Sequence, residues 1–91
     1  MEIIKYFGAI IAENLQISPP AARGLIKLAI KDRYGPFKPL EQLTFNDYKE
    51  VLKNEVKTRL ETIEINNIDE LISRLINFLI ENQSIITLGE V

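Results

Sequence analysis

The segment from Ser18 to Pro36 carries helix signals at both of its ends, and it constrains the fold more than any other part of the chain. Ser18 is suited to accept a hydrogen bond from the first free backbone N–H groups, and Pro19 supplies the fixed φ angle that suits the first helical position. Gly35 followed by Pro36 is typical of a left-handed residue at a helix end and of a stop beyond it. The segment therefore predicts a helix over residues 19–34 with a tight connection at each end.

The two faces of this predicted helix differ in chemistry. Its apolar residues recur at steps of three and four, which predicts one buried face. The opposite face carries three cations at steps of four, and at 3.6 residues per turn each step rotates the side chain by about 40° around the helix. We call these three residues the cationic stripe, and they are Arg23, Lys27 and Lys31.

Three further segments place apolar residues at helical spacing. They are residues 2–15, a segment that begins after Thr44, and residues 68–82. Thr44 and Asp47 stand at the spacing of a capping box, and Asn67 is a residue suited to cap the last helix. The stripe expected to be buried in the middle segment consists of Tyr48, Leu52, Val56, Leu60 and Ile63.

Four helices in 91 residues predict a mainly α fold, a compact four-helix domain that spans residues 1–91 as a single unit. Gly8 within the first segment predicts that another helix approaches closely at that point. Residues 62–65 alternate with period two, and residues 84–88 are rich in β-branched side chains. A short two-stranded ribbon between these two stretches is therefore left open.

Composition removes most catalytic chemistry. The chain has no Cys, no His and no Trp, which excludes disulfides, zinc fingers, cysteine nucleophiles and a histidine general base. Neither a glycine-rich phosphate loop nor a metal-ligand spacing occurs in the sequence. We therefore expect no enzymatic activity, no catalytic residue, no cofactor and no metal. Because the sequence also lacks a long apolar run and a signal peptide, we expect a cytoplasmic protein without a membrane partner.

Charge is distributed unevenly along the chain. Residues 1–39 hold six cations and three acids, whereas residues 40–91 hold five cations and ten acids. The two balances, +3 and −5, give the net charge of −2. Such asymmetry indicates a nucleic-acid contact in the basic half, a partner with a complementary field, or mutual neutralisation of the two halves within the fold.

The stretch AENLQISPPAARGLIK, residues 12–27, resembles the helix-turn-helix of bacterial and archaeal transcription regulators. Ala12 stands at the small position of the first helix, and Gln16 occupies the turn position where that family usually has Gly in a left-handed conformation. The resemblance implies that the helix 19–34 is a recognition helix. It also implies that Ser18, Arg23 and Lys27 face the DNA groove or phosphates. Together with Lys31, these residues form the predicted contact with nucleic acid or with an acidic protein partner.

The last predicted helix and the residues after it carry more apolar residues than one core requires. Phe78 and Ile80 lie off the main stripe of that helix, and Ile86 and Leu88 follow in the tail. These four residues form the protein interface that the sequence predicts. We therefore interpret the chain as a small helical interaction module that self-associates or docks on a larger protein assembly. The alternative is a helix-turn-helix DNA-binding regulator.

Overall fold

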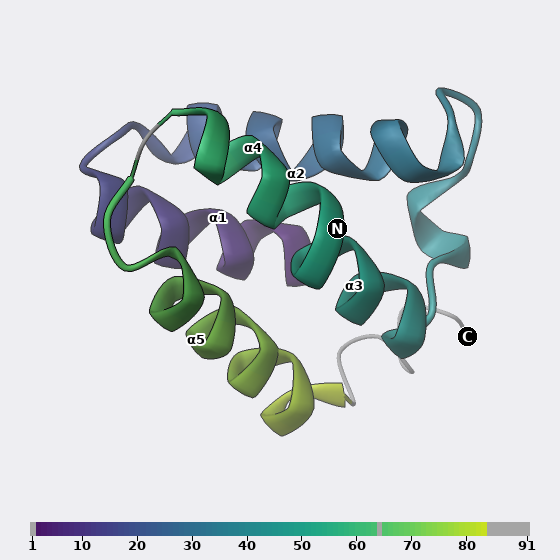
Figure 1. Cartoon of the computed structure of the whole chain (residues 1–91). Helices are drawn as coiled ribbons and strands as arrows, with labels where there is room; N and C mark the ends of the chain where they lie inside the picture. The colour runs from purple at the N-terminus through teal and green to yellow at the C-terminus, as the bar shows by residue number, and fades with distance from the viewer. Residues whose placement is uncertain (1, 64, 84–91) are drawn as a thin grey trace.

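The computed structural model describes residues 2–63 and 65–83, and these residues form four helices without a strand (Figure 1). Three segments, α3, η2 and α4, follow one another without a break and count as one helix. The predicted mainly α, four-helix fold is confirmed. The elements are α1 (Glu2–Leu15), α2 (Pro19–Tyr34), the 3-10 turn η1 (Leu40–Gln42), α3 (Phe45–Val51), the π-helical turn η2 (Leu52–Val56), α4 (Lys57–Thr62) and α5 (Ile68–Glu81).

Among the described residues, the two-stranded ribbon that the sequence left open lacks its first strand, which was expected at residues 62–65. Thr62 is still the last residue of α4, and Ile63 forms the turn that follows it. The N–H of Ile63 donates to the carbonyl of Leu60 at 3.3 Å, so residues 62 and 63 complete a helix end and do not begin a strand. Residues 84–88 lie outside the described residues.

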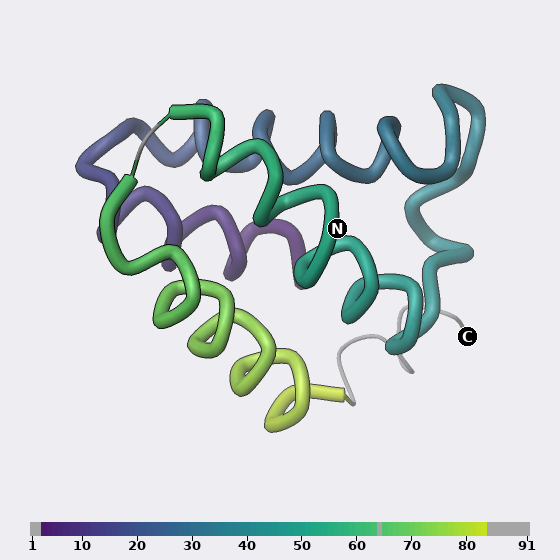
Figure 2. The backbone as a smooth tube through the Cα atoms, in the orientation of Figure 1, coloured from purple at the N-terminus to yellow at the C-terminus, as the bar shows by residue number. Residues whose placement is uncertain are grey.

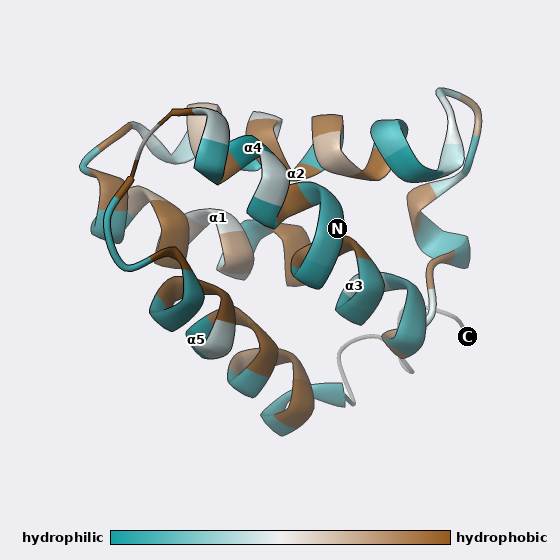
Figure 3. Cartoon of the chain, viewed as in Figure 1, coloured by the Kyte–Doolittle hydropathy of each residue, from teal (hydrophilic) through white to brown (hydrophobic). Residues whose placement is uncertain are grey.

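Helices α1 and α2 form a hairpin, and the other two helices cover it. The two helices run side by side in opposite directions in Figures 1 and 2, and their mutual contact is the most extensive in the fold. The continuous helix α3–η2–α4 packs on α2, and α5 packs against both α1 and α3–η2–α4. Figure 3 shows apolar residues on the side of α5 that faces the other helices and hydrophilic residues along its outer edge.

The core lies between the hairpin and the two covering helices, and its centre is aromatic. The ring of Phe7 is fully buried and meets the rings of Tyr48 and Phe78 edge-on, with centroid distances of 5.9 and 6.1 Å. Such edge-to-face pairs add to the free energy gained by burying apolar area. Because the three rings come from α1, α3 and α5, their contacts connect three helices directly.

Gly8 lies where α1 and α2 approach most closely. A Cβ atom built on Gly8 would lie 2.6 Å from the Cγ atom of Arg23 and 3.3 Å from the backbone nitrogen of the same residue. A Cβ atom fits there only if the Arg23 side chain moves and the backbone of α2 shifts slightly. The close approach that the sequence predicted at Gly8 is confirmed.

Both ends of α2 show the predicted residues, but one backbone angle differs from that of a usual helix end. Ser18 accepts a hydrogen bond from the backbone N–H of Ala21 at 3.3 Å, which confirms it as the N-cap. Gly35 has φ 84° and ψ 173°, so its φ is positive but its ψ is extended. The predicted left-handed φ is confirmed, whereas the ψ is extended and differs from the usual helix-ending conformation. Pro36 explains the difference, because a proline disfavours helical ψ values at the residue before it.

The substitution Ser18→Ala is expected to lower the free energy of unfolding by about 0.5–2 kcal/mol. The change leaves the N–H of Ala21 without its side-chain acceptor. Urea unfolding measures the effect, and the control is Ser73→Ala on the exposed face of α5, where no cap is lost. Equal midpoints for the two variants would show that Ser18 does not cap α2.

The capping box at α3 is complete, whereas the cap predicted for α5 differs. The N–H of Thr44 donates to the Asp47 carboxylate at 2.9 Å, and the N–H of Asp47 donates to the Thr44 hydroxyl at 3.2 Å. Asn67 precedes α5 in a left-handed conformation, with φ 60°, and its side chain makes no capping hydrogen bond. A capping side chain normally requires an extended backbone. The side-chain cap predicted for Asn67 is therefore wrong.

The helix α3–η2–α4 keeps its apolar stripe buried because of the π turn. Residues at strict steps of four drift by about 40° per step around an α-helix. The wider π turn rotates less per residue and offsets this drift. Tyr48, Leu52, Val56 and Leu60 are all buried as predicted. Ile63 was predicted to continue the stripe but is 54% exposed, because the helix ends at Thr62.

Stability is expected to fall in acid partly through Asp47. Burial by itself would raise the pKa of this carboxyl, but hydrogen bonds from the Thr44 backbone and the Tyr34 hydroxyl lower the pKa overall. A group with a lowered pKa in the folded state stabilises the fold above its unfolded pKa, about 3.9 for Asp. That contribution is lost as the pH falls through the folded pKa.

The test compares urea unfolding of the wild type and of Asp47→Asn at about pH 6 and about pH 3. The wild type should be more stable at the higher pH, and the difference between the two proteins should shrink at the lower pH. A difference that stayed constant over this range would contradict the role of the Asp47 carboxylate.

Candidate docking groove

The contact residues that the sequence predicted on α2 lie along one side of that helix. Lys27 and Lys31 are exposed, and Arg23 is half-buried with its side chain lying over Gly8. Ser18 caps the N-terminus of the same helix. Within residues 2–63 and 65–83, none of the three cations forms an ion pair.

The interface residues predicted on α5 separate into two environments. The Phe78 ring is half-buried and lies 5.5 Å from the Tyr6 ring, centroid to centroid, so it packs at the edge of the core. Ile80 is 47% exposed. Ile86 and Leu88 lie outside the described residues. In the described part of the predicted interface, Ile80 is therefore the exposed residue.

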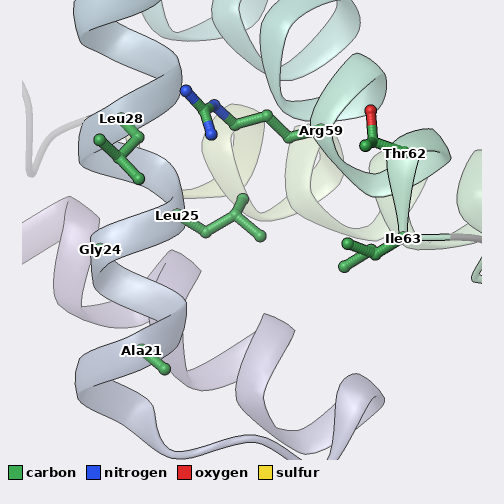
Figure 4. A pocket seen from close by; sticks show the side chains of 7 residues that line it. All are labelled: Ala21, Gly24, Leu25, Leu28, Arg59, Thr62 and Ile63. Atoms are coloured by element: carbon green, nitrogen blue, oxygen red, sulfur yellow. The ribbon is translucent and has the colours of Figure 1, made fainter.

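A groove that the sequence analysis did not predict lies between α2 and the end of α4. Its volume is about 350 Å³, and Figure 4 shows side chains from both helices around it. Leu28 on one wall is 46% exposed, and Ile63 on the other wall is the exposed residue that ends the α4 stripe. The lining residues are Ala21, Gly24, Leu25, Leu28, Arg59, Thr62 and Ile63.

The two walls of the groove are held together by ion pairs across the helices. The Arg59 guanidinium donates through Nε and Nη2 to the two carboxylate oxygens of Asp32, at 2.7 and 3.0 Å. This hydrogen bonding lowers the pKa of Asp32 and raises the pKa of Arg59. Arg33 pairs with Glu55 at 3.3 Å and links α2 to η2. Each pair joins one residue of the basic half to one of the acidic half, but the two pairs run in opposite senses and leave the charge asymmetry of the halves unchanged.

Gly24 lines the groove although the fold does not require a glycine there. A Cβ atom built on Gly24 would meet no atom within 4 Å, in contrast to Gly8. The residue lies in the interior of α2, where Gly costs about 0.8–1.0 kcal/mol relative to Ala. The helix therefore carries a destabilising residue at a position that lines the groove.

Several other kinds of site are missing from the described residues. No group of three or more acidic residues is placed to hold a metal ion in that part of the chain. No helix described there has both the length and the apolarity needed to span a membrane. Burial raises the pKa of the Tyr48 hydroxyl, which is enclosed in the core away from the groove and has no hydrogen-bond partner among the described residues.

Comparisons of the chain with protein-family models, with curated proteins and with solved structures found no match.

Proposed function

We propose that the protein is a non-enzymatic helical interaction module that docks another protein in the groove between α2 and α4. The observation that carries this proposal is Gly24, a helix-destabilising residue with open space around its missing side chain. A glycine in a helix lets another backbone approach closely. Because nothing within the described residues makes that approach, a partner backbone is the simplest occupant of the space.

The shape and chemistry of the groove support the same function. A volume of about 350 Å³ accommodates a few side chains rather than a large substrate. Partly exposed Leu28 and Ile63 offer apolar contacts on opposite walls, as anchor residues of a docked segment require. The one ionisable side chain in the lining is Arg59, which is already paired with Asp32. This lining supports binding rather than catalysis.

Self-association is a weaker form of the same proposal. The sequence suggested self-association because α5 carries more apolar residues than one core requires. One of these residues, Phe78, packs against Tyr6 and Phe7 within the fold. In the described part of the predicted interface only Ile80 is exposed, whereas Leu28 and Ile63 are both exposed beside the groove. We therefore place the main docking surface on α2 and α4.

The experiment is affinity capture from the cells that produce the protein, with three baits compared by quantitative mass spectrometry. The baits are the wild type, Leu28→Glu and Ile80→Glu, and the two substituted residues are matched in exposed fraction at 46% and 47%. We expect at least one protein to be captured by the wild type and by Ile80→Glu but not by Leu28→Glu. Identical sets for all three baits, or a loss confined to Ile80→Glu, would contradict docking in the groove.

DNA binding is the second candidate, and the backbone of Gln16 favours it. Gln16 is left-handed, with φ 55°, and the N–H of Ile17 donates to the carbonyl of Ala12 at 3.2 Å. This is the turn conformation that the helix-turn-helix resemblance requires. A DNA-binding form would use exposed Lys27 and Lys31 on phosphates, and its affinity for duplex DNA would fall steeply with salt concentration.

A further inference from the structure

We propose that the occupant of the groove is an amphipathic helix of another protein, with an apolar face against the groove and acidic residues beside that face. This inference rests on the proposed function and names the class of partner. It depends on where the unpaired cations of α2 stand relative to the groove.

Lys27 and Lys31 lie to one side of Gly24 around α2, and the groove-lining residues Leu25 and Leu28 lie to its other side. Lys31 is seven residues from Gly24, which places the two about 20° apart around the helix and two turns apart along it. Lys27 is three residues from Gly24, and about 60° separates them. Both lysines are exposed and stand outside every ion pair of the described chain. A helix lying over Gly24 would therefore pass beside two unpaired positive charges.

Ion pairing within the fold does not use these lysines, although it uses other cations. Arg33 pairs with Glu55, Arg59 pairs with Asp32, and Lys57 pairs with Asp69 at 3.1 Å. The three pairs connect one helix to another and stabilise the packing. The unpaired charge on α2 is thus concentrated beside the apolar groove, where it can attract an acidic partner and fix its register.

Glycine at position 24 also favours a helix as the occupant. Small residues at a helix crossing allow two backbones to approach closely, as Gly8 does within this fold. Apolar side chains at i, i+3 or i+4 and i+7 of a docked helix would contact Leu28 on one wall and Ile63 on the other. An amphipathic helix fits both the space above Gly24 and the exposed apolar walls.

Charge argues against two other occupants. A second copy that docked through the same face would bring its own Lys27 and Lys31 against a surface that already carries them, and like charges across an interface are unfavourable. Nucleic acid would satisfy the lysines, but it would leave Leu28 and Ile63 exposed beside a phosphate backbone. The combination of cations with an apolar groove therefore favours an acidic amphipathic helix.

The test uses two synthetic helical peptides with the same leucine face, one flanked by Glu and the other by Lys. Fluorescence anisotropy measures their binding to the full chain at low and high salt. We expect the acidic peptide to bind about tenfold or more tightly than the basic one, because several exposed charge pairs change from attraction to repulsion. The difference should shrink as salt rises.

Two double variants locate the effect. Lys27→Glu with Lys31→Glu should remove or reverse the preference for the acidic peptide. Lys5→Glu with Lys53→Glu makes the same change in net charge at two exposed lysines outside the stripe and should leave the preference intact. Circular dichroism of both variants establishes that their helices are retained.

Three outcomes would overturn the inference. The first is equal binding of both peptides, and the second is binding of neither. The third is that the control variant, Lys5→Glu with Lys53→Glu, loses the preference for the acidic peptide as completely as Lys27→Glu with Lys31→Glu does. A short DNA duplex that displaces the acidic peptide and binds more tightly would also overturn it, in favour of the DNA-binding candidate. The proposed function is tested separately by the capture experiment, since loss of a partner with Leu28→Glu does not depend on the charge of that partner.

Discussion

Phe7→Ala is expected to lower the free energy of unfolding by about 3–5 kcal/mol, the range for truncating a buried Phe. The Phe7 ring has no exposed surface and contacts the rings of Tyr48 and Phe78, so its removal leaves a cavity where α1, α3 and α5 meet. Domains of this kind are stable by about 5–15 kcal/mol. The substitution should therefore remove a large part of the total stability.

Phe37→Ala is the matched control, because it makes the same chemical change at a residue that is 92% exposed. A surface substitution of this kind should change the free energy of unfolding by no more than about 0.5 kcal/mol. Urea unfolding followed by circular dichroism measures both variants. Similar effects at positions 7 and 37 would contradict the placement of the aromatic core.

Replacing each of two helical glycines by alanine should change stability in opposite directions. Gly8→Ala places a Cβ atom against Arg23 and forces α1 and α2 apart, and overpacking of this kind costs about 1–3 kcal/mol. Gly24→Ala meets no atom and should instead stabilise the protein by about 0.8–1.0 kcal/mol through helix propensity. Thermal unfolding of the two variants beside the wild type measures both changes.

The pair of glycine variants also bears on function. If Gly24 is kept for a partner, the more stable Gly24→Ala protein should bind that partner less well than the wild type does. Destabilisation by Gly24→Ala would show that the glycine serves the fold itself. Stabilisation by Gly8→Ala would show that there is room for a Cβ atom between Gly8 and Arg23, contrary to the close contact described above.

The helices could be predicted from the sequence where their signals are local. Ser18 and the capping box at Thr44 and Asp47 identify their helix starts because a capping hydrogen bond spans only three residues. Apolar spacing predicted the burial of Leu52, Val56 and Leu60 for the same reason, although it wrongly included Ile63. The ψ of Gly35 departs from the usual helix-ending conformation because Pro36 disfavours helical ψ values at the residue before it.

The groove could not be predicted because it depends on how α2 and α4 meet. Ile63 continues the spacing of its stripe in the sequence, and its exposure follows from the end of the helix at Thr62. Leu28 lies off the buried face of α2, and the sequence gives no sign that both residues line one groove. Gly24 lies in the interior of the predicted helix 19–34, where a glycine alone does not indicate a groove. The sequence signal that indicates a groove on this helix is an apolar residue off the buried face, Leu28, together with a glycine in the helix interior, Gly24.

The most direct test of docking in the groove is photo-crosslinking in the cells that produce the protein. A photoreactive amino acid replaces Ile63 on the groove wall in one variant and Phe37, far more exposed, in another. We predict a discrete adduct to another protein from position 63 and none of the same mass from position 37. Adducts from position 37 with none from position 63 would contradict the claim that a partner docks between α2 and α4.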